Sequence, residues 1–166
     1  MMKTLGFVGL LMAGLAISFS APVPAPARQI LGLDLSMTNE AARERLKELG
    51  SLVRKEAGWQ EVWTVRDPSF SHVIVGFGKD EKLNYITAVA RADKEAKRIE
   101  YEKIGELKKA RQTGDEKIRN FNYQWEIPAG KSNPHLLVIA AGRDPKFLAT
   151  YSLKNLDNVP AKEEND

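Results

Sequence analysis

Two stretches of this chain resemble each other, and their likeness constrains the fold more than any other feature of the sequence. Residues 72–82 read HVIVGFGKDEK and residues 135–146 read HLLVIAAGRDPK, and each opens on one of the two histidines. Trp63 precedes the first stretch and Trp125 precedes the second at nearly the same distance. Internal similarity of this kind is typical of a duplicated structural unit. We therefore predict two copies of one unit, each with a Trp-bearing strand, a loop and a hairpin.

The segments around these stretches have the composition of β-strands. In the first copy, EVWTVRD, SHVIVGFG and LNYITAVA are rich in aromatic and β-branched residues and are separated by Pro68 and a charged turn at 79–82. In the second copy, FNYQWEI alternates apolar and polar residues and is followed by HLLVIAAG and FLATYSL. Each copy is therefore predicted to be a three-stranded antiparallel meander.

The hairpin strands are apolar on both faces. Val73 and Val75 point to one face of the first hairpin and Ile74 to the other, and LLVIAA in the second copy is apolar throughout. A strand with two apolar faces is normally covered on both. We expect the second face to be covered by the other copy, by the segment 105–111 or by a partner.

One helix is predicted before the first meander. Thr38 is a suitable N-cap, Met37 and Ala42 have the spacing of a hydrophobic staple, and Ala42, Leu46 and Leu49 form a stripe at helical spacing. The helix is expected to end at Gly50.

Residues 91–119 are highly charged and fit more than one structure. Alternation at 98–103 suits a strand, whereas Ile104 and Leu107 suit a short helix. We expect a strand end, a short helix near 105–111 and an exposed turn at 113–116. The predicted fold is therefore α+β, with an antiparallel sheet built from two helix-plus-three-strand repeats.

The predicted domain organisation follows from these elements. Residues 30–156 form a single domain, with repeat units at about 30–90 and 98–154. The tail 157–166 is polar, without an apolar pattern, and is expected to be disordered.

The first residues have the order of a secretory signal peptide. Lys3 precedes an uncharged, mostly apolar run at 4–19, and small and proline residues follow. Residues 1–20 are therefore assigned to the signal peptide and 21–29 to a Pro/Ala-rich linker, with cleavage expected after Ser20 or after Ala27. The alternative is a retained N-terminal membrane anchor followed by an extended spacer. The protein is expected to be secreted or periplasmic.

Cysteine usage and charge exclude several classes. The chain has no cysteine, so neither a lipid-bearing cysteine nor a disulfide framework is available. Its 25 Lys and Arg and 22 Asp and Glu are well mixed along the sequence, which gives no clustered basic face for nucleic acid. No second apolar segment is long enough to span a bilayer, so no integral span is expected after signal cleavage.

His72 and His135 are the first candidates for a metal site or for acid and base catalysis. Neither has a ligand partner at helical or hairpin spacing, and no serine lies in a GxSxG motif. Histidines at strand entries commonly satisfy loop groups instead. We therefore predict no catalytic residue, no metal and no cofactor. The alternative is a small secreted hydrolase-type enzyme that uses His72 or His135 with a carboxylate.

Aromatic residues are the candidates for binding. Trp59, Trp63, Tyr123 and Trp125 are numerous for a chain of this size, and Trp and Tyr are favoured at contact surfaces. The alternative is that they belong to the core of the sheet.

The segment ILGLDLSMTNEAARERLKELG, followed by a Trp-bearing strand and a hairpin with a KDEK turn, resembles the small outer-membrane-assembly lipoproteins of the SmpA/OmlA (BamE) type. Those proteins share a Met-Thr-x-Glu helix start and a Leu-Gly helix end before a three-stranded meander. Tandem copies of such a unit also resemble the β-lactamase-inhibitor-protein fold. The likeness covers mainly residues 30–90 and implies a fold rather than a role, and no functional residue is carried over.

These observations favour an exported, non-catalytic binding or envelope-associated protein. Its partner is expected to be a protein or another envelope component, contacted through an exposed sheet face or edge. A homodimer through the same face is a further expectation, and a purely structural envelope protein is a third class.

Overall fold

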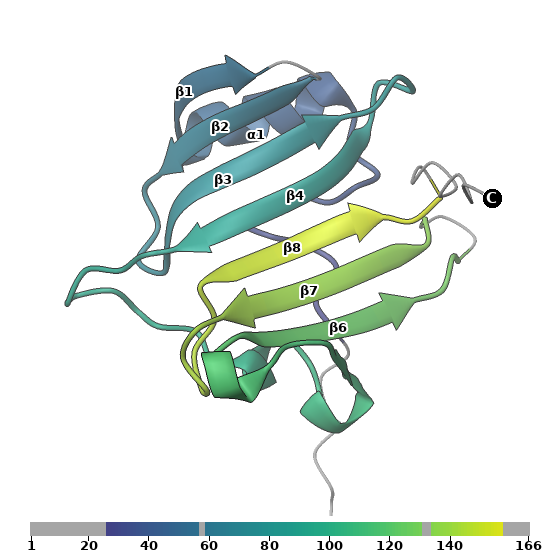
Figure 1. Ribbon diagram of the computed structural model, residues 1–166. Coiled ribbons are helices and arrows are strands. Elements are labelled where there is room, and N and C mark those ends of the chain that lie inside the picture. The colour runs from purple at the N-terminus through teal and green to yellow at the C-terminus, as the bar shows by residue number, and fades with distance from the viewer. Residues whose placement is uncertain (1–25, 57–58, 131–133, 158–166) are drawn as a thin grey trace, which may run out of the picture.

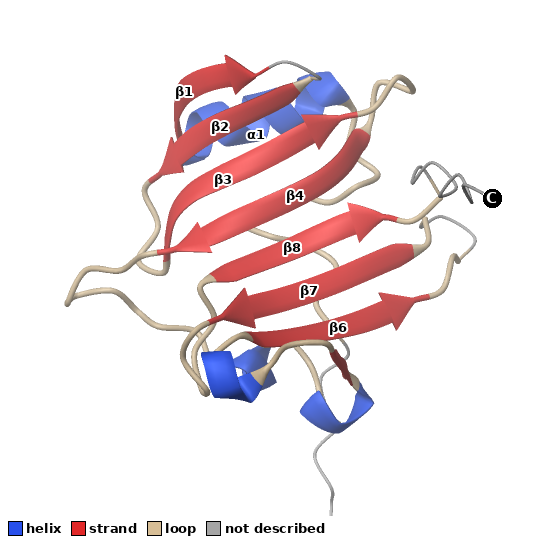
Figure 2. Cartoon of the chain, in the orientation of Figure 1, coloured by secondary structure: helices blue, strands red, loops and turns tan. Residues whose placement is uncertain are grey.

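The computed structural model describes residues 26–56, 59–130 and 134–157. The predicted signal peptide or anchor, most of the Pro/Ala-rich linker and the polar tail beyond residue 157 lie outside these ranges. Within them the chain forms one eight-stranded sheet and one α-helix, as Figure 2 shows. All strand pairs are antiparallel, which confirms the predicted α+β class with an antiparallel sheet.

The helix and strands follow one another along the chain, and their order in the sheet is β1-β2-β3-β4-β8-β7-β6-β5. Their bounds are α1 (Asn39–Leu49), β1 (Gly50–Glu56), β2 (Gln60–Val65), β3 (Phe70–Phe77), β4 (Leu83–Ala90), β5 (Arg111–Gln112), β6 (Phe121–Ile127), β7 (Leu136–Gly142) and β8 (Thr150–Asn155). All six predicted strands are present. The sequence did not predict β1, whose residues are exposed or half-buried and lack an apolar alternation, or the two-residue strand β5, whose residues are both exposed.

The sheet consists of two meanders joined along one seam (Figure 1). β1 to β4 form the first, β5 to β8 form the second, and β4 pairs with β8 between them. The strand registers place Trp63 opposite Val73 and Trp125 opposite Val138, so these pairs correspond. At the seam, Thr87 pairs with Ser152. When the two meanders are aligned on these tryptophan pairs, Thr87 and Ser152 occupy equivalent positions. An approximate two-fold axis therefore passes between them.

This axis separates the two histidines. Because β3 and β7 run in opposite directions across the sheet, His72 and His135 lie at opposite ends of it. They are not equivalent either. His72 pairs with Thr64, the residue after Trp63, and Leu137 pairs with Glu126, the residue after Trp125. When the meanders are aligned on their tryptophans, His72 therefore corresponds to Leu137. The positions that match between the two quoted stretches in sequence are therefore not the positions that correspond in the structure. The reason is that the β6–β7 connection is longer than the β2–β3 connection.

The predicted helix is confirmed as α1. Thr38 is the N-cap, and its Oγ1 accepts a hydrogen bond of 3.2 Å from the Ala41 amide. Ala42 and Leu46 are buried against the sheet. The chain turns at Gly50 directly into β1, where a Cβ atom would lie 1.7 Å from the Thr64 carbonyl oxygen. A glycine is required there by this close approach of two backbones.

The second helix is not found in the described chain, which corrects the prediction of two helix-plus-three-strand repeats. Residues 101–118 instead form three short 3-10 turns, η1 (Tyr101–Lys103), η2 (Leu107–Lys109) and η3 (Glu116–Ile118), with β5 between the last two. Tyr101 and Ile104 are the buried apolar side chains of this region, and Gly105 beside them is also buried. A segment without an apolar stripe gains too little from packing to offset the cost of helix nucleation.

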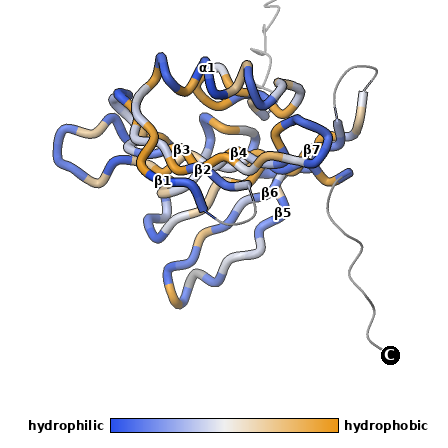
Figure 3. Tube along the Cα trace, turned by 90° about the horizontal axis from the view of Figure 1, so that it is seen from above, coloured by the Kyte–Doolittle hydropathy of each residue, from blue (hydrophilic) through white to orange (hydrophobic). Residues whose placement is uncertain are grey.

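The core lies on one face of the sheet. Figure 3 shows the sheet on edge, with α1 on one side. The core cluster joins α1 and the lead-in residues Ile30, Leu33 and Leu35 to alternate residues of the strands, and Tyr101 and Ile104 extend it over the second meander. Both meanders are thus covered from the same side, and the two copies lie beside each other rather than face to face.

Candidate binding surfaces

The opposite face of the sheet carries no α-helix in the described ranges, and we call it the open face (Figures 1 and 3). Its side chains follow from the strand registers as three rows across six strands. The rows are Thr64, His72, Val89, Thr150, Ala141 and Asn122; Val62, Ile74, Thr87, Ser152, Ile139 and Gln124; and Gln60, Gly76, Tyr85, Lys154, Leu137 and Glu126. Most of these residues are half-buried.

Apolar groups lie at the middle of the open face. Ile74, Val89, Leu137 and Ile139 are all half-buried, and none belongs to the core cluster on the other side. The expectation that the second apolar face would be covered by the other copy or by residues 105–111 is therefore wrong, because the other copy extends the same sheet. The signal for this surface was present in the sequence, since Ile74 interrupts the alternation between Val73 and Val75.

Polar contacts on the open face hold side chains flat against the strands. Thr87 Oγ1 and Ser152 Oγ are hydrogen-bonded at 2.9 Å across the seam. The Tyr85 ring lies over Gly76, where a Cβ atom would be 2.0 Å from the ring, and the Tyr85 hydroxyl donates to Gln60. Burial, and next the charge of Glu56, raises the pKa of Tyr85. The phenol therefore stays neutral and available as a hydrogen-bonding group over the ordinary pH range.

Two of the four aromatic candidates are core residues. Trp63 is 5 % exposed and Trp125 is 3 % exposed, and both point to the covered face. Trp63 Nε1 donates to Glu61 at 3.1 Å, and Trp125 Nε1 donates to the Glu106 carbonyl at 3.0 Å. Their burial corrects the expectation that these two side chains form a contact surface. Tyr123 is half-buried against the same core, with its ring 4.9 Å from that of Tyr101.

Trp59 differs from the other aromatic residues because its side chain is 68 % exposed. Its backbone has a φ of 70°, in the left-handed region, and its carbonyl accepts a hydrogen bond of 3.0 Å from the Phe77 amide. The side chain borders a hollow of about 520 Å³, which we call the Trp59 hollow. The start of α1 (38–40 and Arg43) and three residues of the β3–β4 turn (Gly78, Lys79 and Glu81) form its other walls.

Glu61 is a buried carboxylate that no sequence pattern singles out. Its side chain is 3 % exposed and lies 3.0 Å from Arg43 Nε and 3.5 Å from Lys55 Nζ. Together with Trp63 Nε1, these donors satisfy a charge that would otherwise be costly to bury. Arg43 also stacks over the Phe77 ring at 4.3 Å, so its guanidinium is held in one place beside the Trp59 hollow.

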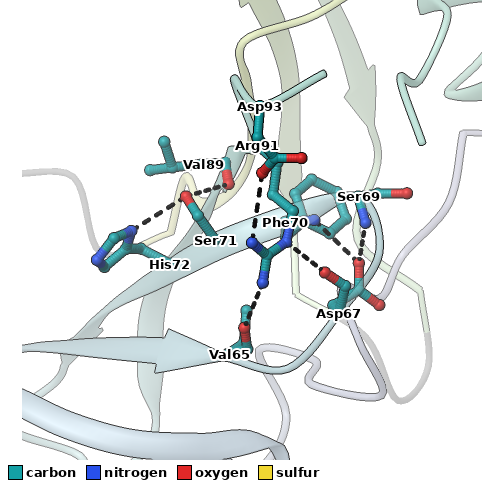
Figure 4. A network of polar contacts seen from close by, with 9 residues as sticks. All are labelled: Val65, Asp67, Ser69, Phe70, Ser71, His72, Val89, Arg91 and Asp93. Carbon is teal, nitrogen blue, oxygen red and sulfur yellow. Dashed lines mark hydrogen bonds and ion pairs between the residues drawn. The ribbon is translucent and has the colours of Figure 1, made fainter. Parts of the chain in front are cut away.

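Neither histidine is part of a complete catalytic group in the described chain. His72 Nδ1 lies 3.0 Å from Ser71 Oγ, which in turn donates to the Val89 carbonyl at 3.3 Å (Figure 4). His135 Nε2 lies 2.7 Å from Glu126 Oε1, and Glu126 is largely exposed. His72 thus has a hydroxyl neighbour and His135 a carboxylate neighbour. Acyl-transfer chemistry would need both at one histidine.

The polar network next to His72 holds the chain as it enters β3 and leaves β4 (Figure 4). Arg91 Nε donates to the Asp67 carbonyl at 2.7 Å, and its Nη2 donates to the Val65 carbonyl at 3.4 Å. Asp67 Oδ1 accepts from the amides of Ser69 and Phe70 at 2.8 and 3.0 Å. These bonds join the β2–β3 loop and the residue after β4 to the end of β2 and the start of β3, so the network has a structural role.

A second hollow of about 510 Å³ lies where residues 90–98 meet the β7–β8 turn. Asp144 in this turn accepts hydrogen bonds from the Lys146 amide at 2.8 Å and from Arg98 at 2.8 Å. These bonds, the Lys146 amide first, lower the pKa of Asp144 to about 2. Arg98 also stacks over the Phe147 ring at 4.0 Å, which fixes the turn against residues 98–101.

Two further properties concern metals and membranes. No cluster of three or more potential metal-ligating His, Asp or Glu side chains occurs in the described parts of the chain. No helix within those parts is long and apolar enough to cross a membrane.

Comparison with known proteins adds no family to this description. No protein-family model matches the chain, and the searches of curated proteins and of solved structures produced no match.

Proposed function

We propose that this protein is an exported, non-catalytic binding module whose open face is the contact surface for a protein or another envelope component. The observation that carries the proposal is the set of half-buried apolar side chains Ile74, Val89, Ile139 and Leu137, which are spread over the three rows of the open face. Apolar side chains gathered on an uncovered sheet face are typical of an interaction site.

The charge distribution on the open face supports a protein partner. Among the eighteen positions of the three rows, only Lys154 and Glu126 carry a full charge, and both lie in one outer row. Protein interfaces have the same arrangement, because charged residues are depleted at their centre and polar residues form the rim.

Export is proposed on the order of the N-terminal residues, from Lys3 through the apolar run 4–19 to the small residues that follow. In this proposal the two meanders are divergent copies of one SmpA/OmlA-like unit, arranged side by side as in a β-lactamase-inhibitor-protein-like sheet. The matched registers of Trp63 with Val73 and of Trp125 with Val138 support a common origin.

The test is capture of a partner from an envelope extract of the source organism with the chain lacking residues 1–20. We expect Val89→Arg and Ile139→Arg each to weaken capture of the same partner about tenfold or more, because each buries a charge at the centre of the interface. Val53→Arg is the matched control, since Val53 is 50 % exposed on the edge strand β1. Equal capture by all variants would rule out the open face.

A homodimer is a distinct result of the same set of variants. If the wild-type chain sediments as a dimer and Ile139→Arg as a monomer, the occupant of the open face is a second copy. Urea unfolding of each variant separates loss of binding from loss of folding.

Hydrolysis is the second candidate function, because His135 Nε2 and Glu126 Oε1 lie 2.7 Å apart. A carboxylate at this distance can orient a histidine that acts as a general base. Turnover of p-nitrophenyl acetate by the wild-type chain, lost in His135→Asn and kept in His72→Asn, would support it. Equal rates for all three proteins would exclude it.

A further inference from the structure

A tryptophan at an exposed, left-handed position is unexpected, and it lies away from the open face. Trp59 ends the connection between β1 and β2 with a φ of 70° and a side chain that is 68 % exposed. Glycine or asparagine adopts this backbone region at lower cost, and large side chains rarely do. A residue that is unfavourable both in its backbone and in its exposure is a candidate for a functional role.

The backbone beneath Trp59 is fixed although the side chain is free. The Phe77 amide donates to the Trp59 carbonyl at 3.0 Å and extends the β2–β3 ladder by one residue. The opposite wall is also fixed, because the Asn39 amide donates to the Glu81 carbonyl at 2.8 Å and Gly78 donates to the Lys82 carbonyl at 2.6 Å. The Trp59 hollow is therefore formed before any ligand arrives, which lowers the entropy cost of binding.

The charges around the hollow cancel. Arg43 and Lys79 face Glu40 and Glu81, and the uncharged polar residues Thr38 and Asn39 complete the wall. Trp59 is the only large apolar side chain among these residues. A nucleic acid or another polyanion would need an excess of positive charge, and an apolar peptide segment would need a largely apolar lining.

Several amides at the start of α1 are already hydrogen-bonded within the protein. The Asn39 amide is bonded to Glu81, the Ala41 amide to Thr38 Oγ1 and the Ala42 amide to the Thr38 carbonyl. Two of the first-turn amides that usually bind phosphate at a helix N-terminus, those of Asn39 and Ala41, are thus already satisfied.

Buried Glu61 provides a second link between the core and the hollow. It accepts from Arg43 Nε at 3.0 Å, and Arg43 stacks on Phe77, so the guanidinium is oriented from below. The remaining guanidinium N–H groups are donors in a fixed plane at the wall of the hollow. Glu61 thereby acts as a positioning residue for Arg43.

We propose that the Trp59 hollow binds a neutral sugar unit of an oligosaccharide or polysaccharide. A sugar ring has an apolar face of C–H groups that stacks on an indole, and hydroxyl groups at its rim that both donate and accept hydrogen bonds. The hollow offers this combination, with one exposed indole, donors on Arg43 and Lys79, and acceptors on Glu40 and Glu81. Its volume of about 520 Å³ is within the range of ligand pockets.

The experiment is isothermal titration calorimetry of the chain lacking residues 1–20 with chitotetraose, maltohexaose and cellohexaose, and with dextran sulfate as the anionic comparison. We expect at least one neutral oligosaccharide to bind, and Trp59→Gly to weaken that binding about tenfold or more. Glycine relieves the left-handed backbone, so this variant remains folded, and its urea unfolding midpoint checks that it does.

Ile118→Gly is the matched control, because Ile118 is 71 % exposed and lies in the other half of the chain. It should bind as the wild type does. Glu61→Gln should weaken binding less than Trp59→Gly and should do so through a less favourable enthalpy, since it loosens Arg43. Binding by dextran sulfate alone, binding by none of the neutral oligosaccharides, or full binding by Trp59→Gly would each overturn the proposal.

Discussion

The two meanders share their strand registers but differ in what precedes them. In the first, Thr38 at the start of α1 forms a bridge to Lys82 in the β3–β4 turn. In the second, Glu100 at the start of η1 forms the corresponding bridge to Phe147 beyond the β7–β8 turn. The anchor to the hairpin is therefore kept in both halves, whereas an eleven-residue helix follows it in one and a three-residue turn in the other.

This difference shows which contacts a half of the molecule requires. Both halves bury a tryptophan in the core. In both halves, a residue that precedes the meander also forms a β-bridge to the hairpin connection. The segment that covers the core face of each meander can vary, because it packs against the sheet on one of its own sides only. Ala42 and Leu46 of α1 cover the first meander, and Tyr101 and Ile104 cover the second. The following substitutions test how far this equivalence extends.

The largest effect is expected from Trp63→Ala and Trp125→Ala. If the tryptophans are equivalent core residues, each substitution should lower the free energy of unfolding by about 3–5 kcal/mol. Urea unfolding measures both, with Trp59→Ala as the exposed control. A small loss for either one would show that the two halves do not use their tryptophans in the same way.

The next largest difference in stability is expected between substitutions in α1, which covers the first meander, and in the 3-10 region, which covers the second. Leu46 of α1 is fully buried, and Leu46→Ala should cost about 2–5 kcal/mol. Leu107 of η2 is only half-buried, and Leu107→Ala should cost about 1 kcal/mol or less. Equal losses in thermal or urea unfolding would mean that the 3-10 region supports its meander as strongly as α1 does.

The two hairpin turns should differ in their response to acid. The pKa of Asp144 is lowered to about 2 from an ordinary value of 3.8, so its ionised form stabilises the fold above about pH 4. That contribution is lost as the pH falls from 4 toward 2. Asp144→Asn should therefore flatten the decline of stability over this range.

Asp80 in the first turn is the matched control, because it accepts one long hydrogen bond of 3.4 Å, whereas Asp144 accepts three between 2.8 and 3.0 Å. Asp80→Asn should alter the acid dependence less than Asp144→Asn. Identical unfolding curves between pH 2 and 4 for wild type and Asp144→Asn would contradict the assigned role of that carboxylate.

The smallest effect on stability is expected at Trp59. Glycine removes the cost of a left-handed backbone, about 1–2 kcal/mol, but adds about 0.5–1 kcal/mol of chain entropy in the unfolded state. Trp59→Gly should thus change the free energy of unfolding by between zero and about 1.5 kcal/mol in the stabilising direction. A loss above 1 kcal/mol in urea unfolding would assign Trp59 to the fold rather than to the hollow.

The strands themselves were predictable because their signal is local. β4 and β6 follow the predicted segments residue for residue, and α1 begins at its predicted cap. The stripe at 42, 46 and 49 and the alternation at 121–127 each require only one element to be considered at a time. The weak pattern at 105–111 led to a helix that the fold does not form, since a few apolar residues cannot stabilise one.

The candidate surfaces depended on neighbours that are distant in sequence. Four aromatic residues had similar sequence contexts, yet Trp63 and Trp125 are buried and Trp59 is exposed. The hollow beside Trp59 joins the start of α1, the end of a hairpin connection and the β3–β4 turn, which no local pattern brings together.

The sequence by itself determined six of the eight strands, the capped helix α1 and the presence of two similar meanders, because periodicity and capping act within a few residues. Only the tertiary structure decided how the meanders combine. Pairing of β4 with β8 placed them side by side, covered both from one side and left the other face open. The physical reason is that an edge strand can accept any partner with free backbone groups, and alternation of side chains does not specify which partner that is.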